Sequence, residues 1–248
     1  MSTLLLRLAG PLQSWGTESR FNTRQTGITP SKSGVIGLLA AALGLRRDSD
    51  VACLGQLRFG VRTDQEGVLL RDFQTVHIPK RNAPEITYRY YLSDAVFLAG
   101  LESDDEQFLR ELEAALRAPV WSLYLGRRSC PPTQPLVLGI RSLGLYDALA
   151  REPWQVSEWK RAQWARQHSG KMPELSIFMD ADGSGYGRTV ISDEPISFDQ
   201  RDRRYGFRAV EGMHPVTPPD AMPTTNQNTE HDAFAELEDL DAAIQNRT

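Results

Sequence analysis

The sequence has few cysteines and no long apolar segment, and each shortage excludes a class of protein. Its two cysteines, Cys53 and Cys130, are too few for a disulfide scaffold and suit a reducing compartment. No apolar run reaches the roughly 20 residues that a membrane-spanning helix needs. The leucine run at 4–6 is too short for a signal peptide and is followed by Arg7. We therefore expect a cytoplasmic protein with no membrane partner.

Patterns for nucleotide hydrolysis, metal binding and catalysis are also missing. No Gly-x-x-x-x-Gly-Lys-Ser/Thr spacing occurs. Neither cysteine has another cysteine or a histidine within four residues, so we predict no metal site and no cofactor. The four histidines share no motif and are widely separated, at His77, His168, His214 and His231. We therefore predict no catalytic residues.

The charge balance neither indicates nor excludes a nucleic-acid partner. The net charge is −4, from 28 basic and 32 acidic residues. Seven of the acidic residues and only one of the basic residues lie in the tail from residue 216 onward. Without that tail the chain carries 27 basic and 25 acidic residues, a net charge of +2. Any contact with RNA must therefore be a local patch or groove.

Hydrophobic periodicity and turn residues predict a ferredoxin-like α+β fold. The expected order is strand, helix, strand, strand (or hairpin), helix, strand, which RNA-recognition modules share. The aromatic stacking signature of those modules is absent, so the order alone does not indicate RNA binding. The expected helices span residues 33–45 and 106–116, and the expected strands span 4–8, 56–63, 69–76, 86–92, 95–101 and 136–140.

Three parts are expected along the chain. Residues 1–145 should form the ferredoxin-like domain, from which a long β-hairpin projects at about 71–101. Residues 146–215 should form a small β-rich C-terminal subdomain. Residues 216–248 are acidic and rich in Pro, Thr, Asn and Gln at their start, and we expect them to be disordered.

The stretch at 10–45 is the first candidate binding site. A strand leads into a polar loop with an exposed-looking segment around Gln13 and Trp15, and the loop ends at an apolar helix. Arg24, Thr26 and Lys32 lie in the loop and at the helix start, where backbone N–H groups can bind an anion. The alternative is a purely structural strand–loop–helix unit, and the spacing leaves both open.

Three further segments combine cations with aromatic residues or loops. The hairpin interleaves Lys80, Arg81 and Arg89 with tyrosines that include Tyr91, which suits phosphates and stacked bases. An ordinary β-hairpin whose tyrosines pack in the core would have the same sequence pattern. Other candidates are the adjacent loop arginines Arg127 and Arg128, and then Arg204 and Arg208 near the last strands. Loop arginines bind phosphate or stack on a base, but they also pair with surface carboxylates.

Several motifs closely resemble the CasD subunit family of type I-E CRISPR Cascade, a branch of the RAMP superfamily. The resemblance spans roughly residues 3–212. It rests on LRLAGPLQSWG at 6–16, PSKSGVIGLL at 30–39, RDFQTV at 71–76, RYYLSDA at 89–95 and YLGRRSCP at 124–131, with weaker matches at 193–196 and 204–210.

This resemblance implies a non-catalytic RNA-binding subunit. It would bind the 5′ handle of the CRISPR RNA and cap the helical backbone of repeated subunits. The hairpin would be a thumb that displaces a base and contacts the neighbouring backbone subunit, while another face seats the large subunit. Target DNA would be reached only through the assembled complex, since base pairing with the guide reads its sequence.

The alternative is a metal-independent endoribonuclease that processes the same RNA. Such an enzyme needs an acid and a base around the attacked 2′-hydroxyl. His77 and Tyr91, near the hairpin, are the candidates for these roles. Relatives in other CRISPR subtypes cleave RNA, whereas this family is regarded as non-catalytic.

Overall fold

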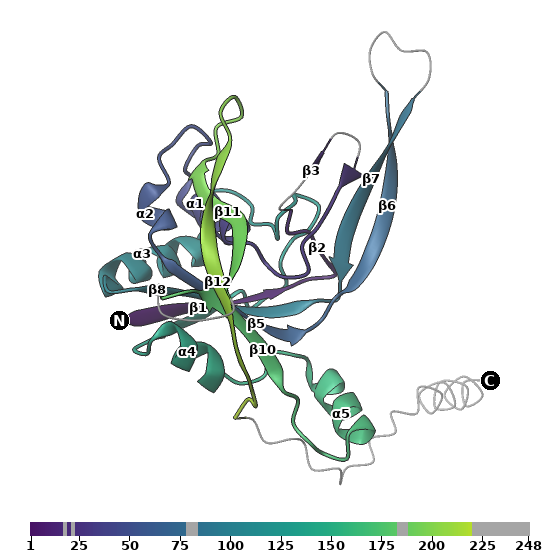
Figure 1. Cartoon of the computed structure of the whole chain (residues 1–248), viewed down its shortest axis with the longest axis vertical. Coiled ribbons are helices and arrows are strands. Elements are labelled where there is room, and N and C mark those ends of the chain that lie inside the picture. The colour runs from purple at the N-terminus through teal and green to yellow at the C-terminus, as the bar shows by residue number, and fades with distance from the viewer. Residues whose placement is uncertain (17–18, 21–22, 78–83, 183–187, 220–248) are drawn as a thin grey trace, which may run out of the picture. The chain divides into compact units, whose positions relative to one another are not determined.

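The computed structural model describes residues 1–16, 19–20, 23–77, 84–182 and 188–219 (Figure 1). The chain divides into two compact units, which we describe separately. The first consists of residues 1–157 and 172–220, and the second of 158–171 and 221–248. In the second unit, helix α5 (Glu158–Gln167) ends where the Trp164 ring stacks on His168, with ring centroids 3.7 Å apart.

A seven-stranded antiparallel sheet forms the centre of the first unit, in the order β11-β12-β10-β5-β8-β1-β9 (Figure 1). Its strands are β1 (Ser2–Ala9), β5 (Arg58–Gln65), β8 (Val96–Ser103), β9 (Val137–Arg141), β10 (Leu175–Asp180), β11 (Thr189–Ser197) and β12 (Arg204–Val216). The first unit also contains α1 (Lys32–Leu43), α2 (Ala52–Gly55), α3 (Glu106–Arg117) and α4 (Leu145–Arg151).

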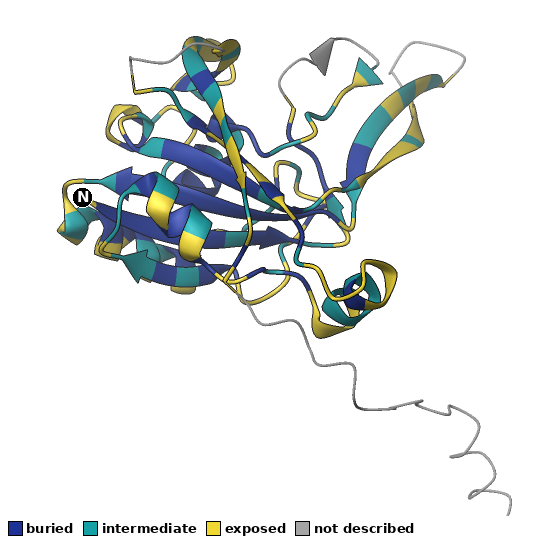
Figure 2. Cartoon of the chain, turned by 60° about the horizontal axis from the view of Figure 1, so that its bottom comes forward, coloured by how far each residue is buried: buried dark blue, intermediate teal, exposed yellow. Residues whose placement is uncertain are grey.

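Side-chain alternation in β1 gives the sheet two buried faces (Figure 2). Leu4, Leu6 and Leu8 belong to the larger apolar cluster, which also includes residues of α1 and α3. Leu5, between them, belongs to a second cluster with Leu98 of β8 and residues of α4 and β10. Burial on both faces explains why β1 is an almost continuous run of leucine rather than an alternating pattern.

Helix α1 begins and ends with sequence-encoded caps. The Ser31 hydroxyl accepts a hydrogen bond from the Gly34 amide at 3.2 Å, and Gly44 ends the helix with a left-handed φ of 73°. The amides of Val120 and Trp121 then donate to carbonyl groups of the last turn. The predicted buried helix at 33–45 is therefore confirmed.

A smaller sheet carries the projecting hairpin. It comprises β2 (Leu12–Gln13), β3 (Ser19–Arg20), β4 (Thr23–Arg24), β6 (Val68–Val76) and β7 (Glu85–Ser93). The strands β6 and β7 pair over nine positions and project together from the sheet (Figure 1). The predicted pairing of these two strands is confirmed, whereas the tip predicted near 80–85 lies mostly outside the described residues.

The predicted boundary near residue 145 does not coincide with a break in the sheet. Strand β10 pairs with β5, so β10, β11 and β12 extend the sheet that contains β1. The predicted strands and helices before that boundary are confirmed to within a few residues. The observed architecture is a mixed α/β fold with antiparallel pairing throughout the large sheet.

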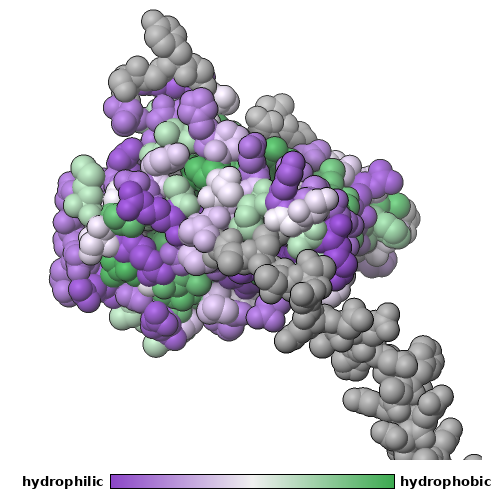
Figure 3. Space-filling view, turned by 90° about the horizontal axis from the view of Figure 1, so that it is seen from below, coloured by the Kyte–Doolittle hydropathy of each residue, from purple (hydrophilic) through white to green (hydrophobic). Residues whose placement is uncertain are grey.

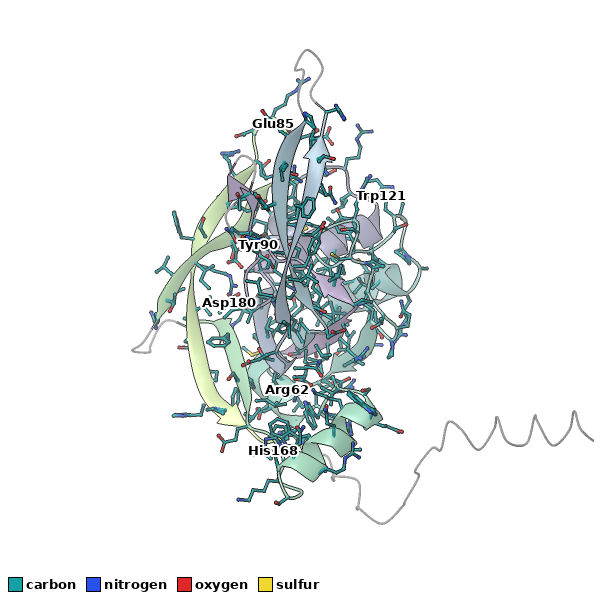
Figure 4. All side chains as sticks on the ribbon, turned by 90° about the vertical axis from the view of Figure 1, so that its right-hand side faces the viewer. Arg62, Glu85, Tyr90, Trp121, His168 and Asp180 are labelled. Carbon is teal, nitrogen blue, oxygen red and sulfur yellow. The ribbon has the colours of Figure 1, made fainter. Side chains whose placement is uncertain are left out.

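A buried ion pair fixes the segment after α4. Arg62 and Asp64 lie fully buried on β5 and form a two-bond contact at 2.7 and 2.8 Å. The Arg62 guanidinium also donates to the carbonyl oxygens of Leu149, Glu152 and Pro153 at 2.6–2.8 Å (labelled in Figure 4). Satisfying these donors is what makes burial of the charge tolerable.

The surface carries both hydrophilic and hydrophobic side chains. Figure 3 shows one face on which hydrophilic and hydrophobic residues are interspersed. In the described part of the chain, no helix is both long and apolar enough to cross a membrane.

Candidate nucleic-acid interface

Gln13 and Trp15 are buried, so the expectation that they are exposed is wrong. The Gln13 amide donates to the carbonyl oxygens of Leu8 at 3.1 Å and Ala95 at 2.7 Å. Its oxygen accepts from the Trp15 indole N–H at 3.0 Å. The indole lies so close to α1 that a Cβ added at Gly34 would be 2.8 Å from the ring. These two side chains therefore hold the loop on the core.

Lys32 and Arg208 belong to a buried ion-pair network. Lys32 lies 2.9 Å from Glu194 and 3.3 Å from Asp180, and Arg208 contacts Asp193 and Asp180 at 2.6 Å. The Asp193 carboxylate also accepts from the Lys32 backbone N–H at 2.8 Å. The predicted anion-binding helix start is thus occupied by a carboxylate of the same chain, which suits the helix dipole.

The network holds Arg208 in its charged form. Burial by itself lowers the pKa of the guanidinium, but hydrogen bonds and charges from Asp193, and then from Asp180, outweigh it and raise the pKa above its usual value. The guanidinium also lies 5.3 Å from the ring centroid of Phe59. Arg208 therefore connects β12 to the core.

Arg127 joins the loop before β9 to β7 and β4. Its guanidinium lies 4.8 Å from the ring centroid of Tyr91, whose side chain is buried. It also donates to the carbonyl oxygens of Tyr90 at 3.2 Å, Arg24 at 3.0 Å and Gln25 at 3.3 Å. Because the guanidinium group is planar and carries several N–H donors, this one arginine can reach all three carbonyl groups.

Close backbone contact holds the same loop against the strand–loop–helix segment. The Ser14 amide donates to the Leu125 carbonyl at 3.1 Å. Gly126 has a φ of 81°, and a Cβ added there would lie 1.8 Å from the Ser14 carbonyl oxygen. On the other side, the Thr26 hydroxyl accepts from the Trp15 amide at 2.8 Å. Thr26 is therefore a local hydrogen-bonding residue of the loop.

The pairing of β4 with β7 aligns two arginines. The register is parallel and places Arg24 beside Arg89, with Asp72 of β6 on the other side of Arg89. Arg24 is exposed and Arg89 is half-buried. The Arg89 Nε atom is buried and has no hydrogen-bond partner among the described residues. Figure 4 shows Tyr90 on this strand nearer the body than Glu85.

Ion pairing separates those predicted cations that the structure describes into two groups. Lys32, Arg204 and Arg208 are paired with carboxylates, in the case of Arg204 with Asp202 at 3.1 Å. Lys80 and Arg81 lie outside the described residues. Four of the predicted arginines form no ion pair within the described ranges and come from β4, β7 and the Gly126 loop. We call them the arginine cluster: Arg24, Arg89, Arg127 and Arg128.

The opposite face of the hairpin is apolar and exposed. The register of β6 with β7 puts alternate residues on this face, and the Arg71 guanidinium lies 5.5 Å from the Tyr88 ring centroid there. Four large apolar residues on this face are between 39% and 65% exposed: Leu69, Phe73, Ile86 and Tyr88.

The two candidate nuclease residues are not close together. Tyr91 pairs with Leu70, seven residues before His77, which corresponds to roughly 20 Å along a strand. Tyr91 is buried, whereas His77 is exposed. Across the described ranges, no group of three or more His, Cys, Asp or Glu side chains is placed to hold a metal ion.

Comparison with known proteins assigns the chain to a family. The family model for CRISPR-associated protein (Cas_Cas5) matches residues 3–211. The chain belongs to this family. The CRISPR system Cascade subunit CasD of Escherichia coli (strain K12) is 41% identical to this Cas5-family chain over an alignment of 159 residues, and the match covers 56% of the chain and 70% of that protein.

Two solved structures share the fold of the Cas5-family chain. One is described as "CRISPR RNA-guided surveillance complex", with 32% identity and a TM-score of 0.72, covering 95% of this chain and 99% of that chain. The other is described as "Crystal structure of Cas protein", with 38% identity and a TM-score of 0.67, covering 89% and 100% respectively.

Some residues that shape the site were not predicted. Asp193 and Asp180 neutralise the charge of Arg208 by forming ion pairs with it. Gly126 permits its loop to approach the backbone of Ser14 closely. Asp193 lies in the weaker family match at 193–196, but no local pattern marks either carboxylate as an ion-pair partner, because the cations that they contact lie far away in the sequence. Gly126 lies in the family motif YLGRRSCP at 124–131, but only its contact with Ser14 reveals why glycine is needed there.

Proposed function

We propose that this Cas5-family chain is a non-catalytic, RNA-binding structural subunit of a type I-E CRISPR Cascade complex. It binds the 5′ handle of the CRISPR RNA and caps the helical backbone, serving antiviral DNA targeting. The observation that carries the proposal is the arginine cluster, four cations without ion pairs in the described structure, in a family whose named relative is a Cascade subunit.

The mechanism is positioning of RNA by phosphate contacts. Arg24 and Arg128 are exposed and supply charge to the RNA backbone, which fixes its register without reading bases. The loops that present these arginines are held in place by the buried side chains of Gln13, Trp15 and Tyr91. Lys80, Arg81 and Arg204 stay in the proposed interface on sequence grounds.

The hairpin and the fold supply the protein contacts. Strands β1, β5, β8 and β9 with α1 and α3 form the ferredoxin-like unit of the proposal, and β6 with β7 forms its thumb. The exposed apolar face around Phe73 and Tyr88 would contact the neighbouring backbone subunit. Another face would seat the large subunit, and target DNA is engaged only through the assembled complex.

The endoribonuclease alternative requires an acid and a base at one 2′-hydroxyl. His77 and Tyr91 are separated by seven strand positions, and Tyr91 lies beneath Arg127. That placement does not favour the two residues as an acid–base pair.

The test uses labelled RNA that ends in the intact 5′ handle. It is incubated with the full chain alone, and then with the other Cascade subunits. We expect uncut RNA, retained only in the assembled complex and released when Arg127→Ala and Arg128→Ala are combined. Cleavage by the chain alone would overturn the proposal and identify a processing nuclease.

The matched control removes another adjacent pair of arginines. Arg46 and Arg47 are both exposed, in the turn after α1. Combining Arg46→Ala with Arg47→Ala changes the net charge by the same amount, so RNA retention should remain unchanged. Equal release by the two double variants would show that bulk charge, rather than the arginine cluster, binds the RNA.

A further inference from the structure

Strand pairing places two like charges side by side. Because Arg24 and Arg89 are register partners in the parallel pair of β4 and β7, their side chains leave the sheet on the same face. Like charges directly opposite each other destabilise a sheet. The buried arginines of the unit, Arg62 and Arg208, have carboxylate partners. Arg24, which is exposed, and Arg89, which is half-buried, have none among the described residues.

The neighbouring carboxylate does not compensate the pair. Asp72 lies opposite Arg89 on β6, yet no ion pair joins the two side chains in the described structure. The Arg89 Nε atom is buried and lacks an acceptor there. A buried donor on a charged group is unfavourable unless an acceptor satisfies it. The site therefore lacks an acceptor that carries negative charge.

We propose that one phosphate group binds between Arg24 and Arg89. Its oxygens accept hydrogen bonds from both guanidinium groups, and its charge removes the repulsion between them. Guanidinium forks match the geometry of phosphate oxygens. The inference rests on the proposed function in taking this phosphate to be part of the RNA backbone, because inorganic phosphate offers the same chemistry.

Arg127 positions one half of this phosphate site. It donates to the carbonyl oxygens of Arg24 and Gln25 while its guanidinium stacks on Tyr91 of β7. Strand β4 is only two residues long, so these bonds add to its pairing with β7. Arg127 is therefore a positioning residue, and Arg24 and Arg89 are the residues that contact the phosphate.

The first experiment measures the thermal midpoint of the full chain, without RNA or partners, as inorganic phosphate or pyrophosphate replaces chloride at constant ionic strength. The wild type should be stabilised by either phosphate. Arg24→Gln and Arg89→Gln should each weaken the apparent phosphate affinity by about tenfold or more, the loss of one charge-assisted interaction. The double variant should bind phosphate more weakly than either single variant, since both side chains contribute to binding the same anion.

Two readouts separate a phosphate site from a structural role. In chloride alone, Arg24→Gln should leave the midpoint unchanged or raise it, because it removes repulsion from Arg89. Arg47→Gln, which removes an exposed arginine elsewhere, should keep the full response to phosphate. No stabilisation of the wild type by phosphate beyond chloride would overturn the site, and so would an unchanged response in both arginine variants.

The same variants are then assembled with the other Cascade subunits and labelled handle RNA. Loss of RNA retention with Arg24→Gln or Arg89→Gln supports assignment of the phosphate to RNA. Undiminished retention, together with a response to phosphate that depends on both arginines, would establish the anion site and overturn its assignment to RNA. If the wild type retains RNA without any response to phosphate, the site is wrong and the proposed function stands.

Discussion

Arg127 and Arg128 are adjacent in the sequence but differ in their surroundings. Arg127 is half-buried, stacks on Tyr91 and donates to three backbone carbonyl groups, whereas Arg128 is exposed. In this pair of adjacent arginines, Arg127 therefore shapes the interface, whereas Arg128 is placed to contact the ligand. The difference depends on hydrogen-bond geometry rather than on charge.

This difference predicts opposite responses to lysine. Arg127→Lys keeps the charge but loses the planar fork, so we expect a loss of about 1–3 kcal/mol in the free energy of unfolding and weaker RNA retention. Arg128→Lys should leave the free energy of unfolding and the RNA retention nearly unchanged, because a lysine ammonium group can also contact an exposed phosphate. Urea unfolding of the chain and RNA retention by the complex measure the two effects. Equal behaviour of the two variants would contradict the assignment.

Gly126 is the position in this loop that is most sensitive to an added methyl group. In Gly126→Ala, the new Cβ would clash with the Ser14 carbonyl, 1.8 Å away, at a φ of 81°. We expect a loss of more than about 2 kcal/mol in the free energy of unfolding, measured by urea denaturation. Gly170→Ala is the matched control, since φ is 75° there and no atom lies within 4 Å of the added Cβ. Its cost should be about 1 kcal/mol, for backbone strain alone.

At the scale of elements, the start of α1 is held by strands that follow much later in the chain. Asp193 of β11 accepts from the Lys32 amide and from Arg208 of β12. The three segments therefore form one electrostatic unit at the helix N-terminus. Because these donors and acceptors satisfy one another, this unit is structural, and the arginine cluster is a separate feature.

Removing Asp193 tests this unit. Asp193→Ala leaves the Arg208 charge and the Lys32 amide without their partner in a buried site, so we expect a loss of about 3–5 kcal/mol in the free energy of unfolding. Asp202→Ala is the control, because its ion pair with Arg204 is exposed and should contribute less than about 1 kcal/mol. Urea denaturation of the full chain compares them. A similar small loss in both variants would refute the buried unit.

For the whole molecule, the charge distribution matters more than the net charge. Residues 1–219 carry a net charge of +2, while the complete chain carries −4. The arginine cluster thus acts in a body that is nearly neutral overall. Binding through a few local phosphate contacts should therefore depend on assembly, rather than on a strong long-range field.

A chain truncated after Pro219 tests the contribution of the acidic tail. Without seven acidic residues, the assembled complex should retain handle RNA equally or more tightly at low salt. The difference should vanish above about 0.15 M salt, where the Debye length is about 8 Å. RNA retention at a series of salt concentrations measures this effect. Weaker assembly of the truncated chain would show instead that the tail docks on a basic surface of a partner.

Local features of the sequence are sufficient to predict the helices, the strands and the family. A nearly continuous leucine run, an apolar helix with Ser31 and Gly44 at its ends, and paired β-forming runs are local signals, and the structure contains each of them. Only the tertiary structure decided which polar residues are free to bind. Lys32 and Arg208 find carboxylates distant in sequence, and Trp15 packs on α1, whereas Arg24 and Arg89 are brought together without such a partner. Charge compensation and burial depend on contacts between distant segments, so composition and spacing cannot reveal them.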